Sequence, residues 1–172
     1  MPINSVSEFT KAQLNGQTFP TLSGYTIPNA QAWIAPPVIG DMAEAPQIYV
    51  WSGKITEKRE TMAGGRTSSI GTTAAFRILT YEMGIFIKYA MPNDEPLADN
   101  IFPVIVDTVM ETLRGTTMPI AIVEVQTGWK SNITDFGEVF TVWYGDIHEA
   151  GDTRFWVYEA EIRMNIRESV QQ

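Results

Sequence analysis

The feature that most constrains this fold is one helical pattern, over residues 99–115, in a chain whose other patterns are mostly those of β-strands. Asp99 or Asn100 can cap its start, because their side-chain oxygens accept hydrogen bonds from backbone N–H groups without an intrahelical partner. Pro103 is tolerated in or near a first turn, and Gly115 suits the left-handed position after a helix. Apolar residues recur at helical spacing and form one stripe: Phe102, Ile105, Val106, Val109, Met110 and Leu113. A lone helix with one apolar stripe is expected to lie on a sheet.

The clearest strand pattern is the alternation over residues 154–170. One face is apolar and carries Trp156, Tyr158, Ala160, Ile162, Met164 and Ile166. The other face is mostly charged, and Glu159, Glu161, Arg163 and Arg167 lie on it. Further strands are predicted over 47–60, 74–90, 118–127 and 138–145, with a bulge or bend at Gly84 and with loops over 61–73, 128–137 and 145–153. The sequence therefore predicts an α+β fold, with a mainly antiparallel β-sheet covered by one central helix.

The first 46 residues have a different character. A short helix is predicted over 7–14, and an extended Pro-rich N-terminal arm follows it, because proline density of this kind favours turns and extended segments. The arm carries large apolar residues that a solvated linker would lack: Tyr25, Ile27, Trp33 and Ile34. We expect it to pack on its own domain or on a neighbouring molecule. The predicted division is a helix and arm over 1–46 and an α+β domain over 47–172.

Charge and composition exclude several classes of protein. The 172 residues include 12 basic and 20 acidic ones, a formal net charge of −8. This balance argues against sequence-independent DNA binding, which needs clustered Lys and Arg. The absence of cysteine rules out disulfides and thiolate metal sites. Residues 1–15 lack a secretory signal pattern, and no apolar run is long enough to predict a membrane span.

No catalytic motif is complete. The only histidine, His148, falls in a predicted polar turn, and no Gly-x-Ser-x-Gly elbow accompanies it. The Gly-rich run over 64–73 superficially suggests a phosphate-binding loop, but no lysine follows Gly71 and a strand rather than a helix comes next. A connecting loop between two strands is the favoured interpretation.

Two carboxylates, Glu159 and Glu161, lie two residues apart on one predicted strand face and could form a general acid/base pair. Because Arg163 and Arg167 continue the same row, a solvated charged face is favoured instead. We therefore predict no enzymatic activity, no cofactor and no metal.

The order of elements and several short segments resemble the tail terminator proteins of long-tailed bacteriophages, especially those of actinobacterial phages. The resemblance runs from 46 to about 170 and includes residues 46–51 (PQIYVW), residues 57–66 (E-x-RETMAGGR), the Asn-Ile-Phe-Pro opening of the helix, Gly137-Glu138 at the start of a strand, and residues 152–155 (DTRF) before the last strand.

The resemblance implies a virion protein of the tail–neck junction, made in the host cytoplasm. Such proteins form a homohexameric ring that caps the tail tube, stops its polymerisation and joins it to the head connector and neck proteins. Genomic DNA passes through the lumen without sequence-specific binding, and no membrane is involved. We expect an interface formed by residues Arg59, Gly64, Gly65, Arg66, Trp33, Glu159, Glu161 and Arg163.

Three alternatives remain open. The chain could be another neck or head–tail joining protein, or the tail-tube subunit itself. From a different class, a small-molecule-binding sheet protein could use Trp143, Trp156 and Tyr158 as one aromatic pocket wall.

Overall fold

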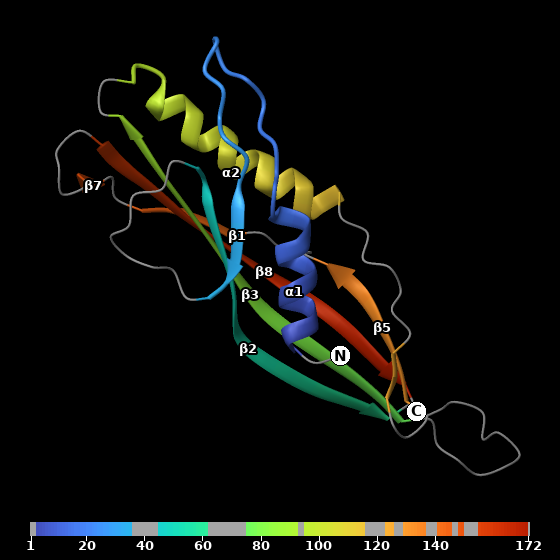
Figure 1. Ribbon diagram of the computed structural model, residues 1–172. Coiled ribbons are helices and arrows are strands. Elements are labelled where there is room, and N and C mark those ends of the chain that lie inside the picture. The colour runs from blue at the N-terminus through green and yellow to red at the C-terminus, as the bar shows by residue number, and fades with distance from the viewer. Residues whose placement is uncertain are drawn as a thin grey trace, which may run out of the picture.

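The computed structural model describes residues 3–35, 45–61, 75–92, 95–115, 123–125, 129–136, 141–145, 148–149 and 155–171. The helices are α1 (Ile3–Leu14) and α2 (Ala98–Gly115). The strands are β1 (Gln31–Ile34), β2 (Gln47–Thr61), β3 (Ala75–Pro92), β4 (Val123–Val125), β5 (Trp129–Phe136), β6 (Thr141–Tyr144), β7 (His148–Glu149) and β8 (Phe155–Gln171). The predicted α+β class is confirmed (Figure 1).

The described strands form one mixed sheet in the order β1-β2-β3-β8-β5-β4, with β6 and β7 also paired to β8. The parallel pair is β1 with β2, and the other pairs are antiparallel. Three long strands, β2, β3 and β8, form the centre. They continue past both helices toward the end marked C in Figure 1.

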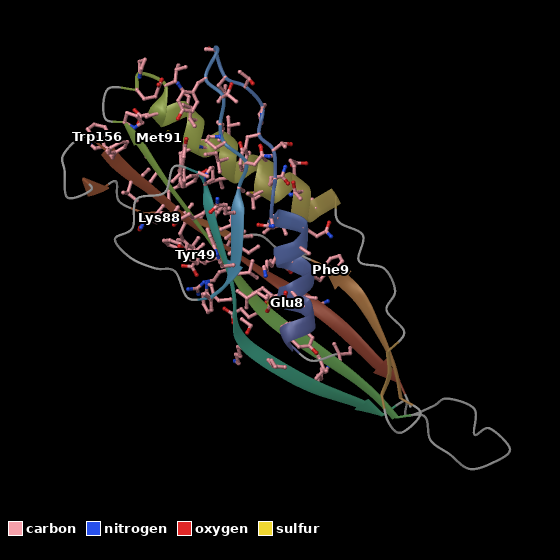
Figure 2. All side chains as sticks on the ribbon, in the orientation of Figure 1. Glu8, Phe9, Tyr49, Lys88, Met91 and Trp156 are labelled. Atoms are coloured by element: carbon pink, nitrogen blue, oxygen red, sulfur yellow. The ribbon has the colours of Figure 1, made fainter. Side chains whose placement is uncertain are left out.

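Both helices pack on the same face of this sheet, which we call the inner face. The predicted stripe of α2 is confirmed: Phe102, Ile105, Val106, Val109 and Leu113 are buried, and Met110 is partly buried against them. Alternate residues of the central strands meet this stripe and belong to the same core: Tyr81, Met83, Ile85 and Ile87 from β3, and Ala160, Ile162, Met164 and Ile166 from β8. The apolar face predicted for the last strand is thus the core face. Trp156 lies at its end, close to Met91 (Figure 2).

The start of α2 differs from the prediction. The helix begins at Ala98, so that Asp99 lies inside the first turn rather than at the cap. The Glu95 side chain accepts a hydrogen bond from the Leu97 N–H at 3.2 Å, in the turn just before the helix. Asp99 instead accepts one from the Tyr158 hydroxyl at 3.1 Å, which joins the helix start to β8.

Gly84 is not a bulge. The ladder between β3 and β8 continues without interruption through Gly84, and the irregularity falls in β2, between Ser52 and Lys54. Gly84 faces Trp51 directly, and a Cβ placed on it would come within 2.2 Å of Trp51 Cε2. The glycine therefore makes room for the indole ring rather than for a bend in the backbone.

The N-terminal helix is longer than predicted and is part of the core. Val6 and Leu14 are fully buried on α1, and Phe9 is only half-buried. The Thr10 hydroxyl is also buried and donates to the Val6 carbonyl at 2.9 Å, so its polar group is satisfied. Glu8 and Phe9 are labelled on this helix in Figure 2.

The described part of the arm packs on its own chain. Ile27, Ala30 and Ala32 are buried in the common core, and the Tyr25 and Tyr89 hydroxyls share a hydrogen bond of 2.9 Å. Strand β1 then pairs with β2. On the other edge of β1, the Ala32 N–H donates a hydrogen bond to Asn15 Oδ1. The division of the chain at residue 46 stays a prediction.

Two predicted loops contain strands. Strand β5 occupies 129–136, within the loop predicted over 128–137, and β7 places His148 in a short strand rather than in a turn. Both are held by pairing with β8, a partner that the local sequence does not reveal. Except for Thr61, which ends β2, the predicted loop over 61–73 lies outside the described residues. Within the part of the chain that the structure describes, neither helix is long and apolar enough to cross a membrane.

Candidate protein interface

The face of the sheet opposite the two helices, here called the outer face, carries the most distinctive group of side chains. Strand register brings five residues into one row across it. In order from β1 to β6 the row is Trp33, Tyr49, Phe86, Glu161 and Trp143. Neither described helix lies on this face, so its exposed members are available to another molecule.

Aromatic rings make up most of this row. Trp33 stacks on Tyr49 with ring centroids 5.4 Å apart, and Tyr49 meets Phe86 at 6.4 Å in a tilted arrangement. Tyr49 is buried, whereas Trp33 is 37% exposed and Trp143, at the other end, is 49% exposed. Exposed tryptophans at both ends of an aromatic row are typical of protein-binding surfaces, where such rings supply contact area at low entropic cost.

Three charged residues surround Trp143. Together with this ring they form what we call the outer-face cluster, which consists of Glu82, Trp143, Glu161 and Arg163. The Arg163 Nε donates to Glu161 Oε1 at 2.7 Å, and its Nη1 lies 3.9 Å from Glu82 Oε1. The guanidinium also lies over the Trp143 ring, 4.9 Å from the centroid. The hydrogen bond to Glu161, and then its charge, raise the pKa of Arg163. These contacts within the chain hold the cluster together.

A shallow depression of about 270 Å³ opens beside the cluster. Its lining is formed by Glu82, Thr141, Trp143, Arg163, Met164 and Asn165. A carboxylate, a guanidinium and an indole ring around a shallow hollow suit it to receive a polar or aromatic side chain of a protein partner.

The tyrosine hydroxyls of the inner face form hydrogen bonds that connect elements of the fold. Burial, and then the hydrogen bond to Asp99, raise the pKa of Tyr158 to about 12. Burial also raises the pKa of Tyr89, whose hydroxyl bonds to that of Tyr25. These hydroxyls therefore stay protonated and tie α2 and the arm to the sheet.

The structure brings together part of the interface predicted from the sequence. Trp33, Glu161 and Arg163 lie on the outer face, and Glu159 occupies the neighbouring position of β8, opposite Lys88. Arg59 lies elsewhere, in β2 beyond its bulge, opposite Arg77. Gly64, Gly65 and Arg66 fall outside the described residues.

The aromatic pocket wall of the small-molecule alternative is not formed. Trp143 pairs with Glu161 on the outer face, whereas Trp156 and Tyr158 occupy inner-face positions opposite Met91 and Tyr89. The three rings therefore cannot line one cavity wall.

The sequence did not identify Glu82, Trp143 or Phe86 as members of the interface. The register of β3, β6 and β8 shows that they are neighbours on the outer face. Among the described residues, no group of three or more His, Cys, Asp and Glu side chains is placed to hold a metal ion. Comparison with known protein families and with characterised proteins found no match.

Proposed function

We propose that this chain is a structural virion protein, a tail terminator that forms a ring on the end of the tail tube of a long-tailed bacteriophage. In this proposal the ring stops tube polymerisation and joins the tail to the head connector. The proposal combines the resemblance of residues 46–170 to that family with the character of the outer face.

The observation that carries the proposal is the outer face itself. A single sheet with helices on one side only leaves its other side to water or to a partner. Here that side presents exposed Trp33 and Trp143 together with the charged outer-face cluster, which is a surface composition typical of protein association rather than of simple solvation. A ring requires this kind of surface, because each subunit must offer two different patches to its neighbours.

The acidic balance of the chain agrees with a channel for DNA. A net charge of −8 disfavours tight binding of phosphates, so DNA can slide through a lumen without being held. The same balance suits a neck protein, and the tail-tube subunit would differ by polymerising instead of stopping growth.

The proposal is tested by native mass measurement and electron microscopy of the purified protein, alone and mixed with the tail-tube protein of the same virion. A closed ring, or a monomer that forms a ring on tube ends and arrests their growth, is the expected result. Long tubes formed by this protein alone would identify it as the tube subunit. A protein that neither forms rings nor affects tubes would contradict the proposal.

A further inference from the structure

The aromatic row of the outer face ends in an exposed tryptophan at both margins of the sheet. Trp33 lies on β1 and Trp143 lies on β6, with β2, β3 and β8 between them. Each of these two marginal strands has four residues, and among the described strands each pairs on one side only. An unpaired strand edge with exposed apolar side chains is a template for pairing with another chain. Both margins are therefore candidates for contact between molecules.

The free edge of β6 is open over its last residues. The Gly145 N–H donates to the Glu159 carbonyl at 2.9 Å, and this bond fixes the phase of hydrogen bonding along β6. Because the backbone groups of an antiparallel strand alternate between its two sides, Trp143 bonds to β8, whereas Val142 and Tyr144 point their N–H and C=O groups away from it. No described residue bonds to these outward groups. Strand β6 thus offers a free ladder edge between two exposed rings, one on each face of the sheet.

The free edge of β1 is open at its end. The Gln31 N–H donates to the Pro46 carbonyl at 2.9 Å, so Ala32 and Ile34, which lie next in alternation, point away from β2. The Ala32 N–H is already used, because it donates to Asn15 Oδ1 at 3.1 Å. No described residue bonds to the Ala32 carbonyl or to the backbone groups of Ile34, whose side chain is 39% exposed. This margin therefore accepts a short partner strand.

The two edges are complementary in direction and in hydrogen bonding. Strand β1 runs in the same direction as β8, and β6 runs opposite to β8, so a second copy set beside the first in the same orientation brings its β1 antiparallel to β6. When the rows continue across the junction, Val142 faces Ile34 of the second copy, and each offers an outward N–H and C=O. Tyr144 faces Ala32 of the second copy, and its N–H suits the free Ala32 carbonyl.

The same register joins the two exposed tryptophans. Trp143 then faces Trp33 of the second copy at a position without hydrogen bonds between the two residues, where facing Cα atoms are only about 4.5 Å apart and side chains lie closest. Aromatic pairs at facing positions stabilise a sheet. The rings are 49% and 37% exposed in the single chain, so the contact removes apolar surface of both from water.

We propose that β1 of one copy pairs with β6 of the next copy, so that the sheet continues from subunit to subunit. This inference rests on the proposed function, since it supplies the subunit contact of the ring. The two edges are different, so the contact is heterologous and repeats until the ring closes. The tryptophan pair fixes the register, because a shift by one residue would place the two rings on opposite faces of the sheet.

The test uses the absence of cysteine from the chain. Two forms of the full chain carry one cysteine each, Trp33→Cys and Trp143→Cys. Mixed under mild oxidation, alone and with the tail-tube protein, they should form a mixed disulfide, because facing Cα atoms about 4.5 Å apart are within reach of one. Either form by itself should stay unlinked. Trp33→Cys mixed with Thr141→Cys is the matched control and should not link, because diagonal Cα atoms on one face lie about 7–8 Å apart.

A second pair of variants removes the hydrogen bonds and keeps the tryptophans. Val142→Pro deletes an outward N–H without deleting a bond to β8, whereas Val142→Ala shortens the same side chain and retains the N–H. By native mass measurement and sedimentation, Val142→Pro should assemble at least about tenfold more weakly than Val142→Ala. Ile34→Pro and Ile34→Ala repeat the comparison on β1. Urea unfolding of each variant separates loss of the contact from loss of the fold.

Three outcomes would overturn the inference: a mixture of the cysteine forms that gives no mixed disulfide either alone or with the tail-tube protein, a homodimer of one form as the main product, or proline and alanine variants that assemble alike. Tube capping, measured on the same samples, tests the proposed function separately. A wild type that caps tubes while the cysteine forms stay unlinked removes the inference alone. Rings linked through these cysteines that leave tubes growing contradict the terminator proposal alone.

Discussion

The two faces of the central strands share one backbone and have opposite compositions. On β3, Met83, Ile85 and Ile87 point to the helices and are fully buried, whereas Glu82 and Phe86, which alternate with these core residues, lie on the outer face and are half-buried. The inner face is defined by the stripes of α1 and α2 and contains almost only apolar side chains. Packing within the chain therefore explains the composition of the inner face, whereas it does not account for the exposed aromatic and charged residues of the outer face.

The outer face is itself uneven. Tyr49 and Lys88, in its middle, are buried, whereas Trp143 and Arg163 near β6 are exposed. Trp33 is exposed at the β1 edge as well, but beside β6 and β8 the exposed ring of Trp143 lies together with charged side chains, and a patch of this kind indicates a binding surface more strongly than isolated exposed residues do.

The largest difference between the faces should appear on truncating a core isoleucine. Replacing Ile85, which is fully buried, with Ala should lower the free energy of unfolding by about 2–5 kcal/mol, since it removes buried methyl groups and leaves a cavity. Ile55→Ala is the matched control. Because Ile55 is 49% exposed on β2 beyond the helices, its loss should cost about 0.5 kcal/mol or less in urea unfolding. Equal losses would show that the core extends along β2 beyond its bulge.

A smaller but specific effect is expected at Gly84. Gly84→Ala places a methyl group 2.2 Å from Trp51 Cε2, so the ring must move, at a cost of about 1–3 kcal/mol. Trp51→Ala removes the obstacle. In a double-mutant cycle measured by urea unfolding, the two substitutions together should therefore cost less than the sum of the single ones. Additive losses would mean that the glycine serves the backbone and not the ring.

The free energy of unfolding should depend on pH through the hydroxyl of Tyr158 on the inner face. An unfolded tyrosine ionises near pH 10, and burial with the hydrogen bond to Asp99 raises the pKa of Tyr158 to about 12. The native state thus keeps this proton to a higher pH than the unfolded state does. The stabilisation from the protonated hydroxyl is therefore complete below pH 10 and is lost as the pH rises to 12. Tyr158→Phe should lower stability by about 0.5–1.5 kcal/mol at pH 7 and flatten the decline above pH 10. Tyr144→Phe, at a 55% exposed site, should do less. An unchanged decline in the Tyr158 variant would assign it to other groups.

Long periodic segments could be predicted well from the sequence. The helix expected over 99–115 is α2, and the strand expected over 154–170 is β8, each within one residue, because their apolar periods persist over several turns or alternations. Strand β5 was missed because its residues 129–136 are largely polar and its hydrogen bonds come from β8, which is distant in sequence. Strand β1 was missed because it has only four residues in a Pro-rich segment and is completed by pairing with β2.

The candidate interface was predictable only in part for the same reason. Alternation placed Glu159, Glu161 and Arg163 on a face away from the core, which the structure confirms. It could not show that Trp143 lies under the Arg163 guanidinium, because that contact depends on the register between β6 and β8. Gly84 was misinterpreted for the same reason. Its sequence context predicted a bulge, but the glycine is needed because the Trp51 ring on the neighbouring strand leaves no room for a side chain.

The smallest effect on stability is expected where the effect on assembly should be greatest. Arg163→Gln removes the bond to Glu161 and the contact with Trp143, yet all three groups are partly in water, so the urea midpoint of unfolding should fall only slightly. Arg114→Gln, which breaks the similarly exposed pair with Glu111 on α2, is the control with the same chemistry away from the outer face. If the outer face binds a neighbouring subunit, Arg163→Gln should weaken assembly while Arg114→Gln leaves it unchanged, with both variants unfolding at nearly the same urea concentration. A large loss of stability in the Arg163 variant alone would mean that the outer-face cluster holds the sheet of its own chain together, and its composition would then need no partner to explain it.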